Sequence, residues 1–370
     1  MIFFSQITSL LLIRILSIVL LSCLAFSINS LFDIFLSVTH FVVETNLSPD
    51  GVFCVLLSFV LPIRSIHTSS NISKLNPFYV TGFSDAESCF LVSIVKRSYL
   101  KTGWSVAPNF KIVLHKKDLP LLNQIKSFFE GAGNISLAQN YASYTVSSIK
   151  ELNNIIIPHF EKYPLITQKR ADFLLLKLVV ELMNKSEHLT PEGLRKIVAI
   201  RSSMNFGLTT SLKESFPDIV PVVRPEVNNQ EIPDIRWVIG FSEGESCFFI
   251  DIMNSKTHKV GYRVKMKFQI TQHSRDLGLM NKLLKLLDCG NLIEIASRSA
   301  VDIVITKISD IESKILPLFT DFPLKGNKNL DFLDFCKVLE SIKNNDHLTT
   351  EGLEYIKKIK SQMNSKRISD

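Results

Sequence analysis

A nine-residue segment occurs twice in this 370-residue chain, and this repeat constrains the fold more than any other feature. Gly82–Phe90 (GFSDAESCF) recurs 158 residues later as Gly240–Phe248 (GFSEGESCF), and only two of the nine positions differ. Similarity at a fixed spacing is the mark of a duplicated structural unit. Both copies should therefore adopt the same fold.

The similarity extends along the flanking sequence in the same order. Four further pairs of segments match: HKKDL with HSRDL, YPL with FPL, EHLTPEGL with DHLTTEGL, and MN with MN. We therefore predict two copies of one domain, at residues 74–205 and 234–370, joined by a linker at 206–233. The linker holds four prolines and shows little periodicity. This composition favours an extended path and excludes a helix there.

The first 73 residues differ in kind from the duplicated part. They are strongly apolar, and their longest apolar run, Ile7–Phe26, is about as long as a membrane-spanning helix although it contains Arg14. Three interpretations of this extension stay open. It is a membrane segment, a targeting leader, or an exon or intron reading frame fused to the enzyme. In each case the duplicated fold is expected to begin near Lys74.

Charge and cysteine content narrow the class of protein. The whole chain carries +7, and the first 73 residues carry two basic and three acidic side chains, which leaves +8 on the remainder. Such a surplus is compatible with a polyanionic partner and equally with ordinary solubility. The six cysteines form no CxxC pair and no zinc-ligand spacing. A reduced compartment therefore fits better than a disulfide framework or a zinc site.

Periodicity predicts the same elements in both copies, in the order α-β-β-α-β-β-α with extra helices at the end. The expected strands lie at 89–95, 105–114, 135–138 and 144–147, and at 247–252, 262–271, 292–295 and 301–305. Beside a helix that carries each motif, the expected helices are 119–129, 149–161, 168–184 and 190–204, and 277–287, 308–319, 327–344 and 349–363. Pro77 and Pro233 are expected in the first turns of the motif helices.

The motif helices contain small residues four positions apart. Gly82 is followed by Ala86 in one copy, and Gly240 by Gly244 in the other. Residues at this spacing share one helix face. Glycine inside a helix costs roughly 0.8–1 kcal/mol relative to alanine. The repeated pattern therefore favours a close contact between the two helices over a glycine that merely fits beneath a neighbouring side chain.

A glutamate follows the small-residue face in each copy. If the helices pair in parallel about a pseudo-twofold axis, Glu87 and Glu245 emerge side by side. Two such anions repel each other unless a cation lies between them. Carboxylate and carbonyl oxygens suit Mg²⁺, which can activate a water and stabilise the leaving oxygen of a phosphodiester. A lone acid at a helix end is normally just solvated, but its duplication in an identical context favours an active site.

At these residues the chain resembles a known family. Val80–Ser88 and Val238–Ser246 are similar to the two motifs of single-chain LAGLIDADG homing endonucleases of the fungal mitochondrial type, and the resemblance covers about 75–365. It implies an α+β fold with two pseudo-twofold-related domains. Their antiparallel, saddle-shaped sheets would lie in the major groove of double-stranded DNA. This chain departs from the family pattern at Ser88 and Ser246, where glycine is usual.

The resemblance also implies an activity and a location. The protein would be a mitochondrial monomer with an internal pseudo-dimer, and would cut one asymmetric site of about 20 base pairs with Mg²⁺, promoting the mobility of its intron. The alternative is an RNA maturase that binds the intron RNA and assists splicing. A membrane protein whose soluble part is incidental remains a third hypothesis.

Residue roles follow from the resemblance as well. The glutamates would bind metal together with the backbone carbonyls of Ala86 and Gly244. Lys169 and Lys328 would stabilise charge on the reacting phosphate. Gln272 would orient the nucleophilic water, a role that Leu114, its counterpart in the first copy, cannot share. Candidates for DNA contact are Lys96, Arg97, Lys111, Arg263, Lys265 and Lys267, although each is by itself also compatible with a solvated strand.

Overall fold

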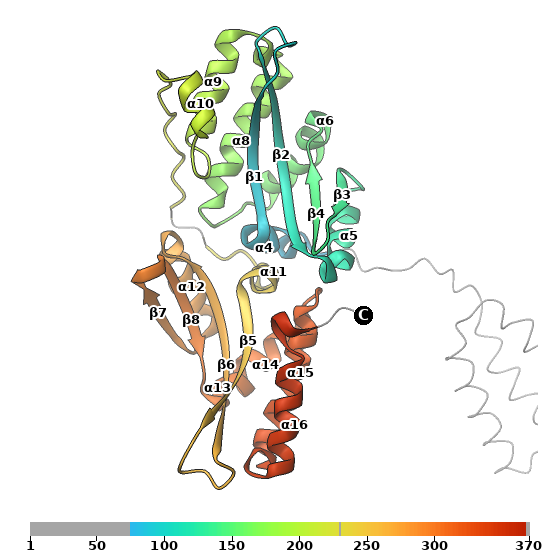
Figure 1. The fold of residues 1–370 in the computed structure, drawn as a ribbon, viewed down its shortest axis with the longest axis vertical. Helices are drawn as coiled ribbons and strands as arrows, with labels where there is room; N and C mark the ends of the chain where they lie inside the picture. Colours follow the sequence, from blue (N-terminus) through green and yellow to red (C-terminus); the bar gives the residue numbers. More distant parts are fainter. Residues whose placement is uncertain (1–74, 229–230, 368–370) are drawn as a thin grey trace, which may run out of the picture. The chain divides into compact units, whose positions relative to one another are not determined.

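A computed structural model describes residues 75–228 and 231–367 (Figure 1). The three interpretations of residues 1–73 concern a segment outside these ranges. Within the described ranges, no helix has both the length and the apolar character that crossing a bilayer requires. Below, the N-terminal half means residues 75–205 and the C-terminal half residues 234–367.

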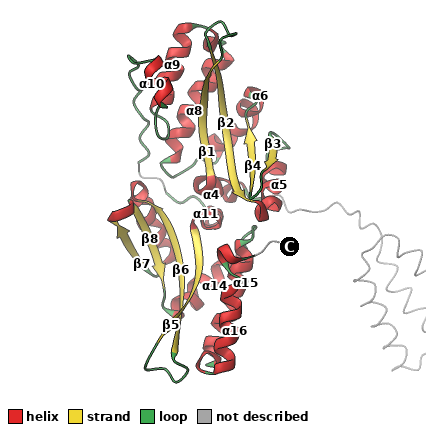
Figure 2. Cartoon of the chain, in the orientation of Figure 1, coloured by secondary structure: helices red, strands yellow, loops and turns green. Residues whose placement is uncertain are grey.

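Both halves have the predicted order of elements (Figure 2). The N-terminal half contains α4 (Pro77–Glu87), β1 (Ser88–Lys96), β2 (Trp104–His115), α5 (Leu119–Phe128), β3 (Asn134–Leu137), β4 (Tyr141–Val146), α6 (Ile149–Glu151), α7 (Ile157–Lys162), α8 (Lys169–Asn184) and α9 (Pro191–Ser202). The C-terminal half contains α11 (Ile235–Glu245), β5 (Ser246–Asn254), β6 (Tyr262–His273), α12 (Leu277–Leu287), β7 (Asn291–Ile295), β8 (Ala300–Ile305), α13 (Ile308–Asp310), α14 (Leu316–Asp321), α15 (Lys328–Lys343) and α16 (Thr350–Ser361). The α+β class is therefore confirmed.

Each half forms one antiparallel four-stranded sheet with an apolar face and an open face. The strand orders are β1-β2-β4-β3 and β5-β6-β8-β7. On β2 the buried residues alternate, and Phe110 packs with Phe129 and Phe160 from the helical side. Residues of the opposite parity on β2 and β6 stay half-buried or exposed. We call the surface that carries them the open face of each sheet.

The motif helices α4 and α11 meet through their backbones. A Cβ atom added to Gly82 would lie 2.1 Å from the carbonyl oxygen of Trp237, and one added to Gly240 would lie 2.0 Å from that of Tyr79. No side chain fits at such distances. At the C-terminal end of the contact, a Cβ on Gly244 would lie 2.4 Å from the Cβ of Ala86. The structure thus places all four small residues in the helix–helix contact.

Three local expectations were wrong. The linker contains a short helix, α10 (Thr210–Ser215), which ends before Pro217. The Thr209 side chain caps it by accepting from the backbone N–H of Leu212, a buried residue. Prolines exclude a helix only where they lie inside it, and this segment precedes them. The more proline-rich stretch 216–228 has neither helix nor strand.

The other two differences also involve proline. Pro233 precedes the first turn of α11, because Asp234 is the N-cap residue and accepts from the backbone N–H of Arg236 at 2.7 Å. The predicted continuous helices 149–161 and 308–319 each contain a five-residue π-helical turn, at Leu152–Ile156 and Ile311–Ile315. A proline follows each turn by two residues. Since proline lacks an N–H and crowds the preceding turn, a wider turn accommodates it.

Candidate active site

The two motif glutamates lie together at the ends of the paired helices. Glu87 is the last residue of α4 and Glu245 the last of α11. The Glu87 carboxylate lies over the neighbouring helix, since a Cβ on Gly244 would be 3.1 Å from its Oε1 atom. Burial raises the pKa of Glu87. Burial, and next the charge of Glu87, raises the pKa of Glu245 to about 7. The two carboxylates are therefore desolvated and repel each other.

A lysine lies at each end of this pair. Lys169 and Lys328 are the first residues of α8 and α15. Lys169 Nζ donates to the carbonyl oxygens of Ser84 at 3.2 Å and Ala86 at 3.0 Å. In the C-terminal half, Lys328 Nζ donates to the corresponding carbonyl oxygens of the motif helix at 3.1 and 2.9 Å. The ammonium groups thus occupy the negative ends of the motif helices.

This arrangement bears on the carbonyls of Ala86 and Gly244. In the structure both accept from a lysine rather than standing free. Burial lowers the pKa of both Lys169 and Lys328, and the charges of the two glutamates oppose that effect. The site therefore gathers two carboxylates, two ammonium groups and a set of helix-end carbonyl oxygens in one small, partly buried volume.

The serines after the glutamates are compatible with the helix exits. Ser88 and Ser246 have extended backbones with φ of −83° and −95°, so neither position needs the freedom of glycine. The hydroxyl of each donates to the carbonyl oxygen four residues earlier, Ser84 or Ser242, at 2.6 Å. Serine therefore replaces the usual glycine without backbone strain and adds a bond at the helix end.

Gln272 makes the site unequal in its two halves. It belongs to β6, is half-buried, and its Nε2 donates to Oε1 of Glu245 at 3.3 Å. Leu114, at the equivalent place on β2, lines the pocket beside Glu87 and has no polar atom to offer. Only the C-terminal glutamate therefore has an amide neighbour from its sheet.

Two buried acids on the motif helices escaped the sequence analysis. Asp85 accepts from the backbone N–H of Ile166 at 3.0 Å and from the N–H and hydroxyl of Thr167 at 3.1 and 2.6 Å. Across the helix contact, Trp237 Nε1 donates to it at 2.8 Å. These bonds fix the loop that leads into Lys169. The signal was present, because an acid precedes the small residue in both motifs.

Glu243 performs the same task in the other half. Its carboxylate accepts from the backbone N–H of Lys325 at 2.6 Å and from the Tyr79 hydroxyl at 2.9 Å. It thereby holds the loop that leads into Lys328. Asp85 and Glu243 therefore serve the same function in the two halves, although this position is one of only two at which the motifs differ.

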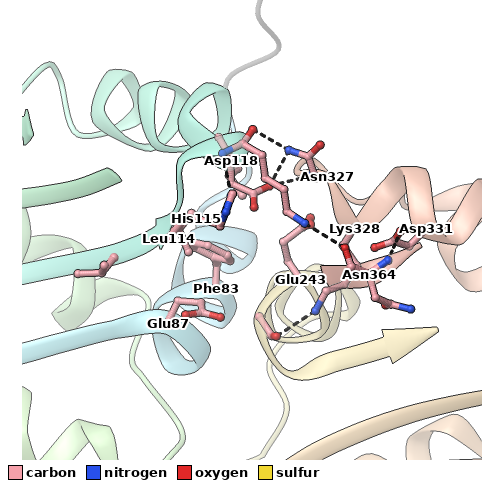
Figure 3. Close-up of a pocket in the computed structure, with 14 residues that line it drawn as sticks. Phe83, Glu87, Leu114, His115, Asp118, Glu243, Asn327, Lys328, Asp331 and Asn364 are labelled. Atoms are coloured by element: carbon pink, nitrogen blue, oxygen red, sulfur yellow. Dashed lines mark hydrogen bonds between the residues drawn. The ribbon is translucent and has the colours of Figure 1, made fainter. Parts of the chain in front are cut away.

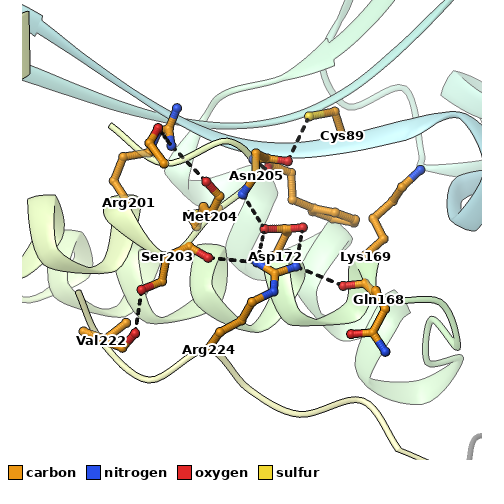
Figure 4. Close-up of polar contacts among 12 residues, drawn as sticks. Cys89, Gln168, Lys169, Asp172, Arg201, Ser203, Met204, Asn205, Val222 and Arg224 are labelled. Carbon is orange, nitrogen blue, oxygen red and sulfur yellow. Dashed lines mark hydrogen bonds and ion pairs between the residues drawn. The ribbon is translucent and has the colours of Figure 1, made fainter. Parts of the chain in front are cut away.

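A second pair of acids, Asp172 and Asp331, anchors the lysine helices α8 and α15, and Figure 4 shows the network around Asp172. Asp172 forms an ion pair with Arg224 of the linker at 2.8 Å and accepts from the backbone N–H of Asn205 at 2.9 Å. Asn205, at φ 47°, also donates to the Phe90 carbonyl oxygen on β1 at 2.9 Å. The repeated Met-Asn pair thus ties the end of α9 to the first strand. In the C-terminal half Asp331, Asn364 and Arg367 repeat the network.

A pocket of about 300 Å³ lies between the halves next to this site (Figure 3). From the N-terminal half it is lined by Glu87 and Asp118, and from the C-terminal half by Gly244, Asn327 and Lys328. Among the described residues, no three His, Cys, Asp or Glu side chains gather as metal ligands. A cation here would therefore depend on the two glutamates, backbone carbonyls and oxygens from water or substrate.

The candidate DNA-contacting residues divide by position. Four of them, Lys111, Arg263, Lys265 and Lys267, project from the open faces by their parity on β2 and β6. Lys96 is the last residue of β1 and shares the parity of its buried residues, although it is exposed itself. Arg97 lies beyond the strand, in the β1–β2 connection. The structure therefore brings four of the six onto the surfaces expected to face DNA.

Comparison with known proteins agrees with this architecture. Residues 80–180 and 238–339 match the family model described as LAGLIDADG endonuclease. The chain is 40% identical over 309 residues to probable intron-encoded endonuclease 2 of Neurospora crassa, an alignment that covers 80% of this chain and 67% of that protein. It is 38% identical over 296 residues to probable intron-encoded endonuclease 3 of the same fungus, covering 79% of this chain but only 55% of that protein.

Solved structures show the same relationship. The LAGLIDADG homing endonuclease I-SmaMI bound to cleaved DNA is 44% identical, with a TM-score of 0.78, and the match covers 80% of this chain and 99% of that one. Two motif helices packed through glycine, each followed by an antiparallel saddle, define a single-chain, two-domain class of protein. The chain belongs to the LAGLIDADG endonuclease family.

Proposed function

We propose that this protein is a homing endonuclease that hydrolyses both strands of one long, asymmetric double-stranded DNA site with Mg²⁺. The observation that carries the proposal is the meeting of Glu87 and Glu245 at the ends of glycine-packed helices. Solved relatives in this family are described as bound to target or cleaved DNA. The maturase alternative is not favoured, because assistance to splicing does not require a pair of desolvated carboxylates.

The donor set fits a hard divalent cation. The glutamates and the helix-end carbonyls offer oxygen ligands. Burial raises the pKa of both carboxylates, the charge of Glu87 raises that of Glu245 further, and a cation between the two would stabilise them. Glu87 and Glu245 would hold the metal, with the carbonyl oxygens of Ala86 and Gly244 as further ligands. The bound metal would supply activation of a water and neutralisation of charge on the phosphate.

The remaining residues would prepare this centre for DNA. Lys169 and Lys328 place positive charge beside the carboxylates, where it can stabilise negative charge that develops on a phosphate. Gln272 would orient a water near Glu245. The open faces would lie in the major groove over about 20 base pairs, with Lys111, Arg263, Lys265 and Lys267 toward DNA, and Lys96 and Arg97 at the edge of one sheet.

We also propose a mitochondrial location and a role in intron mobility. A protein encoded in ND4 intron 1 of Podospora anserina is 43% identical over 122 residues of this chain. The relatives from Neurospora crassa are likewise described as intron-encoded. In the same scheme, residues 74–205 and 234–370 are the two domains and residues 206–233 the linker.

The test uses a DNA target selected by cleavage of a randomised library in Mg²⁺. Glu87→Gln and Glu245→Gln should each lower the rate of double-strand cleavage at least about 1,000-fold, because each removes an anionic metal ligand. Glu214→Gln, at an exposed position on α10, is the matched control and should cleave at the wild-type rate. Binding of the same duplex in Ca²⁺ should be retained by all three variants. If Glu87→Gln cleaved the target at the wild-type rate, the proposal would be refuted.

A further inference from the structure

The repeated His-x-x-Asp-Leu motif forms the turn between the second strand and the next helix in each half. Its last turn residues are Asp118 and Asp276, which end the 3₁₀ turns Lys116–Asp118 and Ser274–Asp276. His115 fixes the first turn by accepting from the backbone N–H of Lys117 at 3.3 Å, and His273 fixes the second in the same way at 3.1 Å. The motif therefore presents its aspartate rigidly at one edge of the site.

Each of these aspartates binds the opposite half of the molecule. Asp118 Oδ1 accepts from the backbone N–H of Asn327 at 2.8 Å and from its Nδ2 at 3.1 Å. Reciprocally, Asp276 Oδ1 accepts from the backbone N–H of Gln168 at 2.8 Å. Gln168 and Asn327 are the N-cap residues of α8 and α15, so the residue after each is the active-site lysine.

The carboxylates of Asp118 and Asp276 bind the N-terminal ends of α15 and α8, which the side chains of their own N-cap residues leave uncapped. Neither Gln168 nor Asn327 caps its own helix with its side chain. The first N–H groups of a helix lack partners within the helix, and an anion there is favourable. The aspartate of one half therefore fixes the first turn of the lysine helix that belongs to the other half.

The charges around the glutamates follow the same crossed pattern. The pocket between the halves contains Glu87 and Asp118 from one half, and Asn327 and Lys328 from the other (Figure 3). Glu87 thus lines the same pocket as the lysine of the opposite half, and the duplication extends this pairing to Glu245 and Lys169.

We propose that Asp118 and Asp276 are positioning residues that assemble two composite centres, each built from the glutamate of one half and the lysine of the other. This inference rests on the proposed nuclease function. One centre combines Glu87, Asp118 and Lys328, and the other combines Glu245, Asp276 and Lys169. Each aspartate then governs the cleavage of one DNA strand, the strand served by the lysine that it holds.

The two braces differ in strength. The Asn327 side chain is bound by two groups of the opposite half, since its Nδ2 donates to the Lys117 carbonyl oxygen at 2.7 Å as well as to Asp118. Gln168 has additional support from the linker. Its Nε2 donates to the Val227 carbonyl oxygen at 3.1 Å, and the Arg224 guanidinium donates to the carbonyl oxygen of Gln168 at 3.2 Å. Loss of Asp118 should therefore have a larger effect than loss of Asp276.

The experiment follows each strand of a duplex labelled with a different fluorophore at each end. Lys328→Met and Lys169→Met first identify the strand that each lysine serves. Asp118→Ala should then slow the Lys328 strand at least about 10-fold and accumulate a nicked duplex, and Asp276→Ala should slow the other strand less strongly. Asp118→Asn, which keeps an accepting oxygen, should restore part of the rate. Asp321→Ala, at an exposed position at the end of α14, is the control and should cut both strands normally.

The outcomes separate this inference from the function on which it rests. If the wild-type chain cuts no DNA, the proposed nuclease function fails. If the wild type cuts and Glu87→Gln does not, but the aspartate variants slow both strands equally or slow the strand of their own half's lysine, only the composite centres are refuted. Thermal unfolding and binding of the duplex in Ca²⁺ show that each variant is folded. Unequal loss between strands is a result that general destabilisation does not produce.

Discussion

The two halves of the molecule share a backbone but present different surfaces. On β6, the open face carries Arg263, Lys265 and Lys267 in a row of alternate residues. The equivalent positions of β2, 158 residues earlier, hold Ser105, Ala107 and Asn109. The C-terminal sheet is therefore cationic where the N-terminal sheet is neutral.

This difference separates two kinds of constraint. Where the halves touch, residue identity is fixed by packing, and an added Cβ at either Gly82 or Gly240 would lie about 2 Å from a backbone oxygen of the other helix. On the open faces of β2 and β6 the side chains are half-buried or exposed, so packing restricts residue identity less. A duplicated domain can therefore keep one shared active site while its two sheets come to recognise unlike half-sites. Three measurements test this difference between the halves.

The first measurement, for which we expect the largest change, is the pH dependence of stability that Glu245 causes. The pKa of Glu245 is raised from 4.5 to about 7, mainly by burial, so the metal-free folded state prefers the protonated acid. The raised pKa of Glu245 contributes about 3 kcal/mol to the free energy of unfolding. This contribution is fully present below pH 4.5 and is lost as the pH rises through 7. Glu245→Gln abolishes this loss. In urea unfolding with a chelator, it should therefore be more stable than the wild type at pH 8 but not at pH 4.

Two controls accompany this comparison. Glu87→Gln should shift stability in the same direction, since burial raises that pKa as well. Added Mg²⁺ should stabilise the wild type at pH 8 and leave Glu245→Gln much less affected, because the cation compensates the buried charge. A stability difference between wild type and Glu245→Gln that does not change with pH would contradict the assignment of a desolvated carboxylate.

The repeat made the fold predictable, because its signals are local. Strand alternation and small-residue spacing give the order of elements and the class of the fold, and both motif helices begin and end near the predicted residues. The contacts that complete the site are not local. Asp118 and Asn327 are separated by 209 residues, and no periodicity in either segment indicates its partner. The sequence therefore marked the motif that contains Asp118 as repeated without showing its role.

The sequence also did not predict the short linker helix or the side of the strand on which a basic residue lies. The linker helix α10 depends on a cap from Thr209 and on burial of Leu212, and the proline-rich stretch that follows it indicates an extended chain instead. The sequence makes Lys96 a candidate for DNA contact because it lies at a predicted strand, yet the pleat of β1 gives it the parity of the buried residues Ile94 and Val92. A composition-based selection of basic residues does not resolve on which side of a strand each one lies.

The second measurement tests the charge difference between the sheets. Replacing Arg263, Lys265 and Lys267 together with alanine should weaken binding of the target duplex about 10- to 100-fold near physiological salt. The slope of log affinity against log salt should fall by about 2 to 3 units, since each phosphate contact contributes about one. Lys267 should contribute least, because its ammonium lies 4.4 Å from the centre of the Phe249 ring and is only half exposed.

The matched variant in the other sheet is Lys111→Gln, which should lower the salt slope by about one unit at most. The reciprocal change, Ser105→Arg with Ala107→Lys, should raise the affinity for unrelated duplexes, because it adds charge without base recognition. A salt slope of the triple variant equal to that of the wild type would show that the cations of β6 do not contact phosphate. The comparison of the halves would then concern base readout alone.

The smallest effect is expected at the strand position beside the glutamates, where one half has an amide and the other a leucine. Gln272→Leu copies the N-terminal half by removing the amide that donates to Glu245 at 3.3 Å. A bond of this length is weak, so cleavage should slow only about 2- to 5-fold. Because that bond lowers the pKa of Glu245, its loss should move the acidic limb of the pH–rate profile to higher pH. Leu114→Gln, the converse change, should leave the acidic limb unshifted or move it to lower pH. A loss of 100-fold or more in Gln272→Leu, with no shift of the limb, would instead mean that the amide acts directly on the reacting water, and that the two centres differ in chemistry rather than only in tuning.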